Sequence, residues 1–142
     1  MRTKLFSVVA GAALLVSVAA VQVSAHHSFA AEFDRNKPIK LTGTVTKVEW
    51  TNPHVWFYIN VKDEKTGKVE NWGAEMGPPH GLQRRGWRRE TLKIGEQVTV
   101  QGSMAKNGTK RMNASTVTMT STGGRPGETL DAASSGAANA DQ

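Results

Sequence analysis

The amino-acid sequence predicts an all-β fold, a small five-stranded OB-like barrel with a short helical insert. Apolar and polar residues alternate along five segments, near 39–46, 54–61, 69–76, 97–104 and 110–120, and a period of two is typical of half-buried strands. A short segment without this period separates the third strand from the fourth. Five strands with a helix at that position follow the order of an OB barrel. A six-stranded open sandwich or an SH3-like barrel would give a similar pattern.

The first two strands carry the clearest alternation. Apolar residues from Ile39 to Val45 share one phase, whereas Val48 and Trp50 share the opposite phase, so we expect a β-bulge near 46–47. An Asn-Pro turn then leads into the second strand, where every other residue of 54–61 is apolar.

Glycine-containing turns and the insert connect the remaining strands. Thr66-Gly67 predicts a turn after the second strand, and Asn107-Gly108 predicts a tight hairpin between the fourth and fifth, since both residues of that pair tolerate positive φ. Gly77-Pro78-Pro79 ends the third strand. In the insert, we expect Leu82 and Trp87 to be buried anchors of one or two helical turns.

The two ends of the chain differ from the barrel segment. Residues 1–25 have a basic start, an apolar run and a small-residue site at Val23-Ser24-Ala25, in the order of a cleavable secretory signal. The alternative is an uncleaved membrane anchor. We expect a signal peptide at 1–25, an N-terminal arm at 26–38, the barrel at 39–121 and a disordered tail at 122–142. This order indicates bacterial export to the periplasm or beyond, with no transmembrane anchor after cleavage.

The exported chain would be basic and contains no cysteine. The sequence has 18 basic and 12 acidic residues, and Arg2 and Lys4 leave with the signal, so the mature charge is 16 minus 12, or +4. A basic surface outside the cytoplasm favours an anionic glycan, the cell envelope or another periplasmic protein, and makes nucleic acid an unexpected partner.

Three short motifs lie at the start of the mature chain and in the first turn of the barrel. They are His26-His27-Ser28-Phe29-Ala30, Phe33-Asp34 and Asn52-Pro53-His54. Together they resemble a family of small exported bacterial proteins that carries only a domain-of-unknown-function label. The resemblance runs from His26 to Thr120, and it implies an exported β-barrel domain without implying an activity.

All four histidines, His26, His27, His54 and His80, lie after the signal. Cleavage after residue 25 would give His26 a free α-amine, and this amine, its own imidazole and a second imidazole would form a three-nitrogen set that suits Cu(II). At the terminus alone, this set resembles the histidine brace of copper monooxygenases and of some periplasmic copper carriers. We expect His54 to be the second imidazole, with His27 as the alternative.

Three residues near the end of the third strand are candidate outer ligands: Glu75, Met76 and His80. A methionine sulfur would favour Cu(I). The α-amine has a free pKa of about 8 and must lose its proton to bind metal, so binding should weaken on acidification. The competing interpretation is that His26 and His27 are simply exposed and that His54 forms a hydrogen bond within its turn.

A second cluster joins Trp87 to four arginines, Arg84, Arg85, Arg88 and Arg89. Four more aromatic residues lie on or beside the strands: Trp50, Trp56, Tyr58 and Trp72. Exposed rings on an OB-type sheet stack on sugars, and guanidinium groups bind carboxylates or phosphates, so these residues predict a surface for an anionic glycan or the envelope. The competing interpretation is that Trp50 and Trp72 belong to the core and that the arginines are a solvated face.

Motifs of catalysis are absent from the sequence. There is no cysteine nucleophile, no G-x-S-x-G, no H-E-x-x-H and no phosphate-binding glycine loop. We therefore expect a non-enzymatic exported binding or accessory domain, most concretely one that binds copper through His26. The alternatives are a glycan- or envelope-binding module and a small copper redox enzyme.

Overall fold

The computed structural model describes residues 28–120 and 126–134 of the chain. Most of the described residues form strands. The strands are β1 (Phe33–Glu49), β2 (Trp56–Lys62), β3 (Val69–Glu75), β4 (Gln97–Ala105), β5 (Arg111–Met119) and β6 (Thr129–Asp131). The helices of the described part are α2 (Ser28–Glu32) and α3 (Pro79–Arg84), and both are short.

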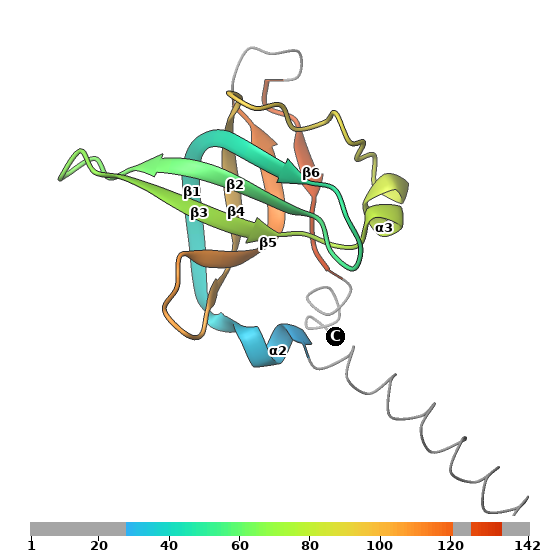
Figure 1. Ribbon diagram of the computed structural model, residues 1–142, viewed down its shortest axis with the longest axis horizontal. Coiled ribbons are helices and arrows are strands. Elements are labelled where there is room, and N and C mark those ends of the chain that lie inside the picture. The colour runs from blue at the N-terminus through green and yellow to red at the C-terminus, as the bar shows by residue number, and fades with distance from the viewer. Residues whose placement is uncertain (1–27, 121–125, 135–142) are drawn as a thin grey trace, which may run out of the picture. The chain divides into compact units, whose positions relative to one another are not determined.

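The sheet closes into a barrel through its first five strands (Figure 1). Its order is β3-β2-β1-β4-β5-β6, and β3 also pairs with β5. That closing pair is parallel, whereas the other pairs are antiparallel. The resulting ring, β1-β2-β3-β5-β4, with α3 between β3 and β4, has the strand order of an OB barrel. The predicted all-β, OB-like fold is therefore confirmed.

Strand β1 is long because it serves both halves of the barrel, with β4 along its first part and β2 along its last. A register shift between Val45 and Lys47 confirms the bulge expected at 46–47. At Gly43, an added Cβ would lie 2.5 Å from the backbone oxygen of Asn60, so only glycine permits this close approach of the two strands. The strand begins at Phe33, which places the second half of the expected arm, 26–38, in the sheet.

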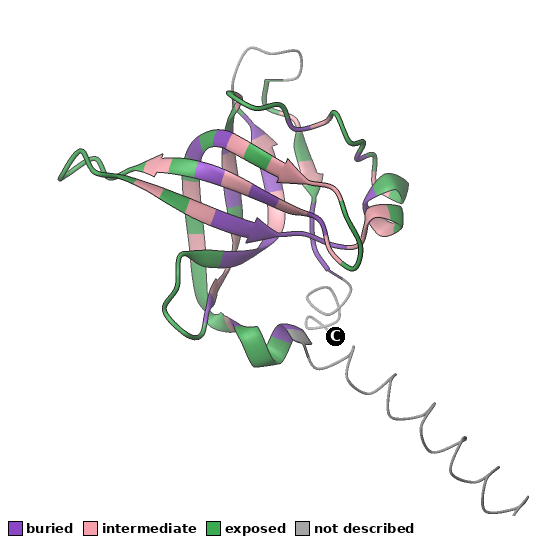
Figure 2. Cartoon of the chain, viewed as in Figure 1, coloured by how far each residue is buried: buried purple, intermediate pink, exposed green. Residues whose placement is uncertain are grey.

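Buried positions alternate with more exposed ones along the strands (Figure 2), and their apolar side chains form one core. Phe57, Ile59 and Met112 are fully buried there. The segment after β3 covers one end of this core, since Leu82 and Trp87 are also fully buried, as predicted.

The expected disordered tail at 122–142 is wrong for residues 126–134. Strand β6 pairs with β5 through Thr116 and Asp131, Val117 and Leu130, and Thr118 and Thr129. Ala132 joins the core and is fully buried. These contacts order a segment whose composition alone predicts disorder. The rest of the tail, the signal peptide at 1–25 and His26 and His27 lie outside the described residues.

Candidate functional site

His54 lies in the turn between β1 and β2, where the chain is held against the residues that follow β3. The amide of Val55 donates to the backbone oxygen of Gly77 at 3.1 Å, and the amide of Met76 donates to the backbone oxygen of Val55 at 2.8 Å. The preceding Asn52–Pro53 peptide bond is cis. Trp56 pairs with Glu75, so their side chains project from the same face of the sheet. His54 lies two residues before Trp56, and the alternation of side chains places it on that face as well.

The His54 side chain forms a short hydrogen-bonded ion pair with Glu75. Nδ1 of His54 lies 2.6 Å from Oε1 of Glu75, and the two side chains are 28% and 9% exposed. Nε2 has no hydrogen-bond partner among the described residues. One edge of the imidazole is therefore fixed by a buried carboxylate, and the other edge forms no hydrogen bond with a described residue.

The charge of this pair changes the titration of the imidazole. The hydrogen bond to Glu75 raises the pKa of His54 above its ordinary value, the negative charges of Glu75 and Glu32 act in the same direction, and burial opposes the rise. The arrangement favours the proton on Nδ1, because that proton is shared with the carboxylate. Nε2 would then be the nitrogen that binds a metal ion or takes up the second proton.

A buried polar residue, Asn113, lies beside Glu75 on the neighbouring strand β5. It pairs with Glu75 across the parallel contact of β3 and β5, and it is 1% exposed. Nδ2 lies 3.4 Å from Oγ of Ser134, whereas the buried Oδ1 has no hydrogen-bond partner. Sequence reasoning did not single out Asn113. The available signal was an amide between Met112 and Ala114, since asparagine is uncommon in the middle of a strand.

The other proposed ligands of the third-strand region are not brought together with His54. Met76 is fully buried in the core, and it follows Glu75 directly, so strand alternation places it on the opposite face. His80 is exposed on α3. Within the described ranges there is no group of three or more His, Cys, Asp or Glu residues that could hold a metal. Of the proposed ligands that lie in the described part of the chain, only His54 and Glu75 are in contact.

The basic and aromatic cluster of the insert has a structural role in part. Trp87 is fully buried, and its Nε1 donates to the backbone oxygen of Asp131 at 2.7 Å. Arg85 donates to Oδ1 of Asp131 at 3.1 Å and to the backbone oxygen of Ala133 at 2.7 Å. Trp87 therefore cannot belong to the expected ligand surface, and it has the role of a buried anchor, whereas Arg85 holds the chain after β6.

The remaining arginines of that cluster, Arg84, Arg88 and Arg89, are exposed. Arg88 also donates to the backbone oxygen of Trp87 at 3.1 Å. Because the tryptophan ring is buried, the exposed part of the cluster consists of these three arginines, and it is basic without being aromatic. Neither helix in the described part of the chain has the length and hydropathy of a membrane span.

Comparison with known proteins gives a family and no named function. No curated protein matches the chain significantly. The chain is similar to a crystal structure of a ZRD-deleted mutant of TiaS in complex with agmatine, at 20% identity and a TM-score of 0.46, over 74% of this chain and 28% of that one. It is also similar to the N-terminal domain of PriB from Thermoanaerobacter tencongensis, at 16% identity and a TM-score of 0.38, over 60% and 97%. The profile of a family of unknown function, DUF6152, matches residues 13–114, and the chain belongs to this family.

Proposed function

We propose that this protein is an exported, non-enzymatic accessory domain that binds Cu(II), with the imidazole of His54 as the ligand supplied by the barrel. The observation that supports this function best is the 2.6 Å contact between Nδ1 of His54 and the buried Glu75. Metal-binding histidines commonly donate their other ring N–H to a carboxylate, which fixes the tautomer and increases the basicity of the ligating nitrogen. Nε2 is the corresponding ligating atom here.

The other ligands in this proposal come from the mature N-terminus. After export and cleavage behind Ala25, His26 offers an α-amine and an imidazole, and His27 is the alternative imidazole. Three nitrogen donors suit Cu(II) better than they suit harder cations. The proposal therefore includes bacterial export to the periplasm, since the amine forms only when the signal is removed.

The proposal is tested by a Cu(II) titration of the exported protein, followed by electron paramagnetic resonance. Intact mass first establishes the start at His26. We expect one Cu(II) per chain with nitrogen hyperfine structure. The His54→Ala variant should lose that signal, whereas His80→Ala, which removes an exposed histidine on α3, should keep it. An unchanged spectrum and affinity in His54→Ala would remove the barrel ligand and contradict the proposal.

The copper redox enzyme is separated from the accessory domain by turnover. Copper-loaded protein should oxidise ascorbate under oxygen no faster than the same concentration of free Cu(II). Turnover above free copper that is lost in His54→Ala would replace the accessory function with an enzymatic one.

A further inference from the structure

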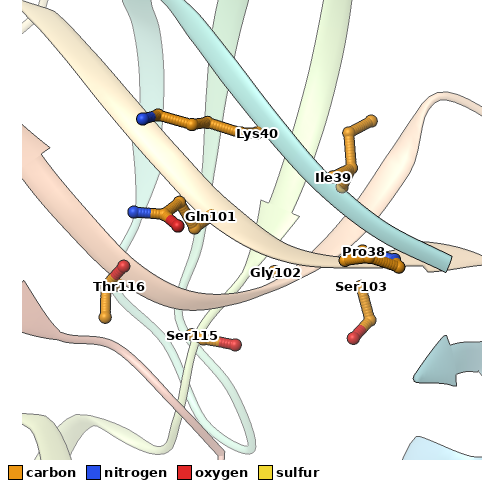
Figure 3. Close-up of a pocket in the computed structure, with 8 residues that line it drawn as sticks. All are labelled: Pro38, Ile39, Lys40, Gln101, Gly102, Ser103, Ser115 and Thr116. Atoms are coloured by element: carbon orange, nitrogen blue, oxygen red, sulfur yellow. The ribbon is translucent and has the colours of Figure 1, made fainter. Parts of the chain in front are cut away.

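A pocket of about 480 Å³ lies on the barrel between β1, β4 and β5 (Figure 3). It coincides with two irregularities of the sheet, the register shift between Gln101 and Gly102 and the one between Asp34 and Pro38. At Gly102, an added Cβ would lie 1.9 Å from the backbone oxygen of Asn113. The absence of a side chain there lets β5 approach β4, and the bulge leaves the surface hollow.

The polar side chains of the pocket lie on neighbouring strands. Lys40 pairs with Gln101 between β1 and β4, and Gln101 pairs with Thr116 between β4 and β5. Ser103 and Ser115 also line the pocket. Directly paired residues project from the same face, so an ammonium, an amide and a hydroxyl form one row across three strands.

These polar groups have no partners within the described part of the protein. No side-chain hydrogen bond or ion pair joins Lys40, Gln101, Ser103, Ser115 or Thr116 to another described residue. Lys40 is the only charged residue that lines the pocket. Their hydrogen-bonding capacity is thus open to water or to a ligand.

The row of paired residues that contains Lys40, Gln101 and Thr116 continues to a carboxylate, Asp131, which already forms hydrogen bonds elsewhere. Asp131 pairs with Thr116 from β6, but its Oδ1 accepts a hydrogen bond from Arg85 at 3.1 Å and another from the amide of Ala133 at 2.9 Å. It does not line the pocket, so the positive charge of Lys40 is not neutralised by a carboxylate of the lining. The pocket therefore favours an anionic group.

Pro38 and Ile39 make part of the lining apolar, and the half-buried Ile39 also packs against the core. One ammonium, four neutral hydrogen-bonding side chains and an apolar wall match the groups of a carboxylated sugar ring. The volume lies within the range of about 300–1,000 Å³ that is typical of small-molecule sites. We infer that this pocket binds a sugar acid, either as the free monosaccharide or as a residue of an acidic glycan.

A single cation distinguishes this ligand from nucleic acid. Nucleic-acid sites neutralise several phosphates with a series of lysines and arginines. The carboxylate of a sugar acid needs one charged partner and uses the hydroxyl and amide groups for the rest of the ring. The inference is independent of copper, since the pocket contains neither a histidine nor a carboxylate.

The test is a ¹H–¹⁵N NMR titration of the full exported chain with sodium D-glucuronate. We expect shifts at the amides of 39–40, 101–103 and 115–116, and an affinity at least about tenfold higher than for D-glucose because a charged hydrogen bond is added. Lys40→Gln should weaken glucuronate binding by about tenfold for the same reason. Lys62→Gln, which removes an exposed lysine at the end of β2, should leave it unchanged.

Tetragalacturonate distinguishes the two sources of the ligand. Tighter binding than glucuronate with shifts at the same amides would assign an acidic glycan, whereas equal binding would assign the free sugar acid. The inference is overturned if neither compound shifts these amides, if glucose binds as well as glucuronate, or if Lys40→Gln binds as the unchanged chain does. Stronger binding of a single-stranded oligothymidylate at the same amides would also overturn it.

Discussion

The insert after β3 and the turn before β2 both carry a polar cluster that stands out in the sequence, yet they differ in what their side chains leave free. In the insert, the indole N–H of Trp87 and the guanidinium of Arg85 both bind the segment that ends β6. In the turn, His54 binds Glu75 through Nδ1 only, and its ring is partly exposed. The first cluster is closed by internal hydrogen bonds, whereas in the second Nε2 of His54 has no hydrogen bond to a described residue.

The difference shows that the chemical type of a side chain does not decide its role. Trp87 beside four arginines fits a ligand surface and a buried anchor equally well by residue type, and its full burial decides for the anchor. A histidine in a turn resembles an ordinary hydrogen-bonding residue until its partner is found to be a buried carboxylate. The unsatisfied atom is therefore the better indicator of function, and the following variants test this distinction.

The largest effect is expected where the insert meets the core. Trp87→Ala should lower the free energy of unfolding by about 3–5 kcal/mol, because it removes a fully buried side chain and leaves a cavity. Urea unfolding measures the change. Trp87→Phe keeps most of the apolar volume and loses the hydrogen bond to Asp131, so it should cost only about 1–3 kcal/mol.

The phenylalanine variant also serves if the alanine variant does not fold. It should keep the Cu(II) affinity of the unchanged chain, because the indole N–H of Trp87 donates to Asp131 and takes no part in the His54–Glu75 pair. A cost below about 1 kcal/mol for Trp87→Ala would contradict a structural role for the insert.

The next effect tests the open cluster. Glu75→Gln keeps the size of the side chain and removes the charge that orients His54, so the Cu(II) affinity should fall by about 10–100-fold. Competition with a chelator of known affinity measures it. Glu70→Gln is the matched control, since Glu70 lies on the same strand and pairs with Lys68 and Lys110 instead. Equal losses in the two variants would show that Glu75 has no specific effect on the ligand.

In the metal-free protein, the stabilisation that the His54–Glu75 pair gives to the fold should depend on pH, and this effect is expected to be smaller than the loss of Cu(II) affinity in Glu75→Gln. Because the folded state raises the pKa of His54, the pair stabilises the fold fully below the unfolded pKa of about 6.5, and this contribution is lost as the pH rises through the folded pKa. The stability difference between the unchanged chain and His54→Gln should therefore shrink as the pH is raised from about 6.

NMR titration of the His54 ring gives the same result directly. The midpoint should lie above about 6.5 in the unchanged chain, and it should fall in Glu75→Gln, because burial then acts without the carboxylate. Equal midpoints in the two proteins would show that Glu75 does not control the protonation of His54.

Most of the barrel follows from local patterns in the sequence. Alternation predicts the strands, and the change of phase after Val45 predicts the bulge. Asn107-Gly108 predicts the place of a turn correctly, but the expected two-residue hairpin is wrong, because residues 106–110 separate β4 from β5 and only Gly108 of the pair has a positive φ, of +73°. Strand β6 does not follow from local pattern, because Leu130 and Ala132 are ordered by contacts with a core that forms elsewhere. Segment composition carries no record of such distant contacts.

The sequence predicts some residues of the candidate site, but it does not predict how their side chains are arranged. The sequence indicates His54 as a ligand and Glu75 as an outer ligand, and the structure instead joins the two by a hydrogen bond. The parallel pairing of β3 with β5 places Asn113 beside Glu75, and two bulges form the pocket at Lys40. Each of these depends on register between distant strands, which a period of two does not determine.

The smallest effect concerns the ion pair that completes the closed cluster. Arg85 and Asp131 have side chains that are 30% and 57% exposed, so Arg85→Gln should cost no more than about 1 kcal/mol of unfolding free energy. Arg89→Gln, at an exposed position of the same insert, should cost nothing measurable. The sharper readout is hydrogen exchange at Ala132, whose amide donates to the backbone oxygen of Ser115. Faster exchange there in Arg85→Gln, without faster exchange in β2, would show that this arginine holds the segment after β6. Unchanged exchange would show that the hydrogen bonds of Arg85 do not hold that segment, which would contradict the description of the insert as a cluster closed by its internal hydrogen bonds.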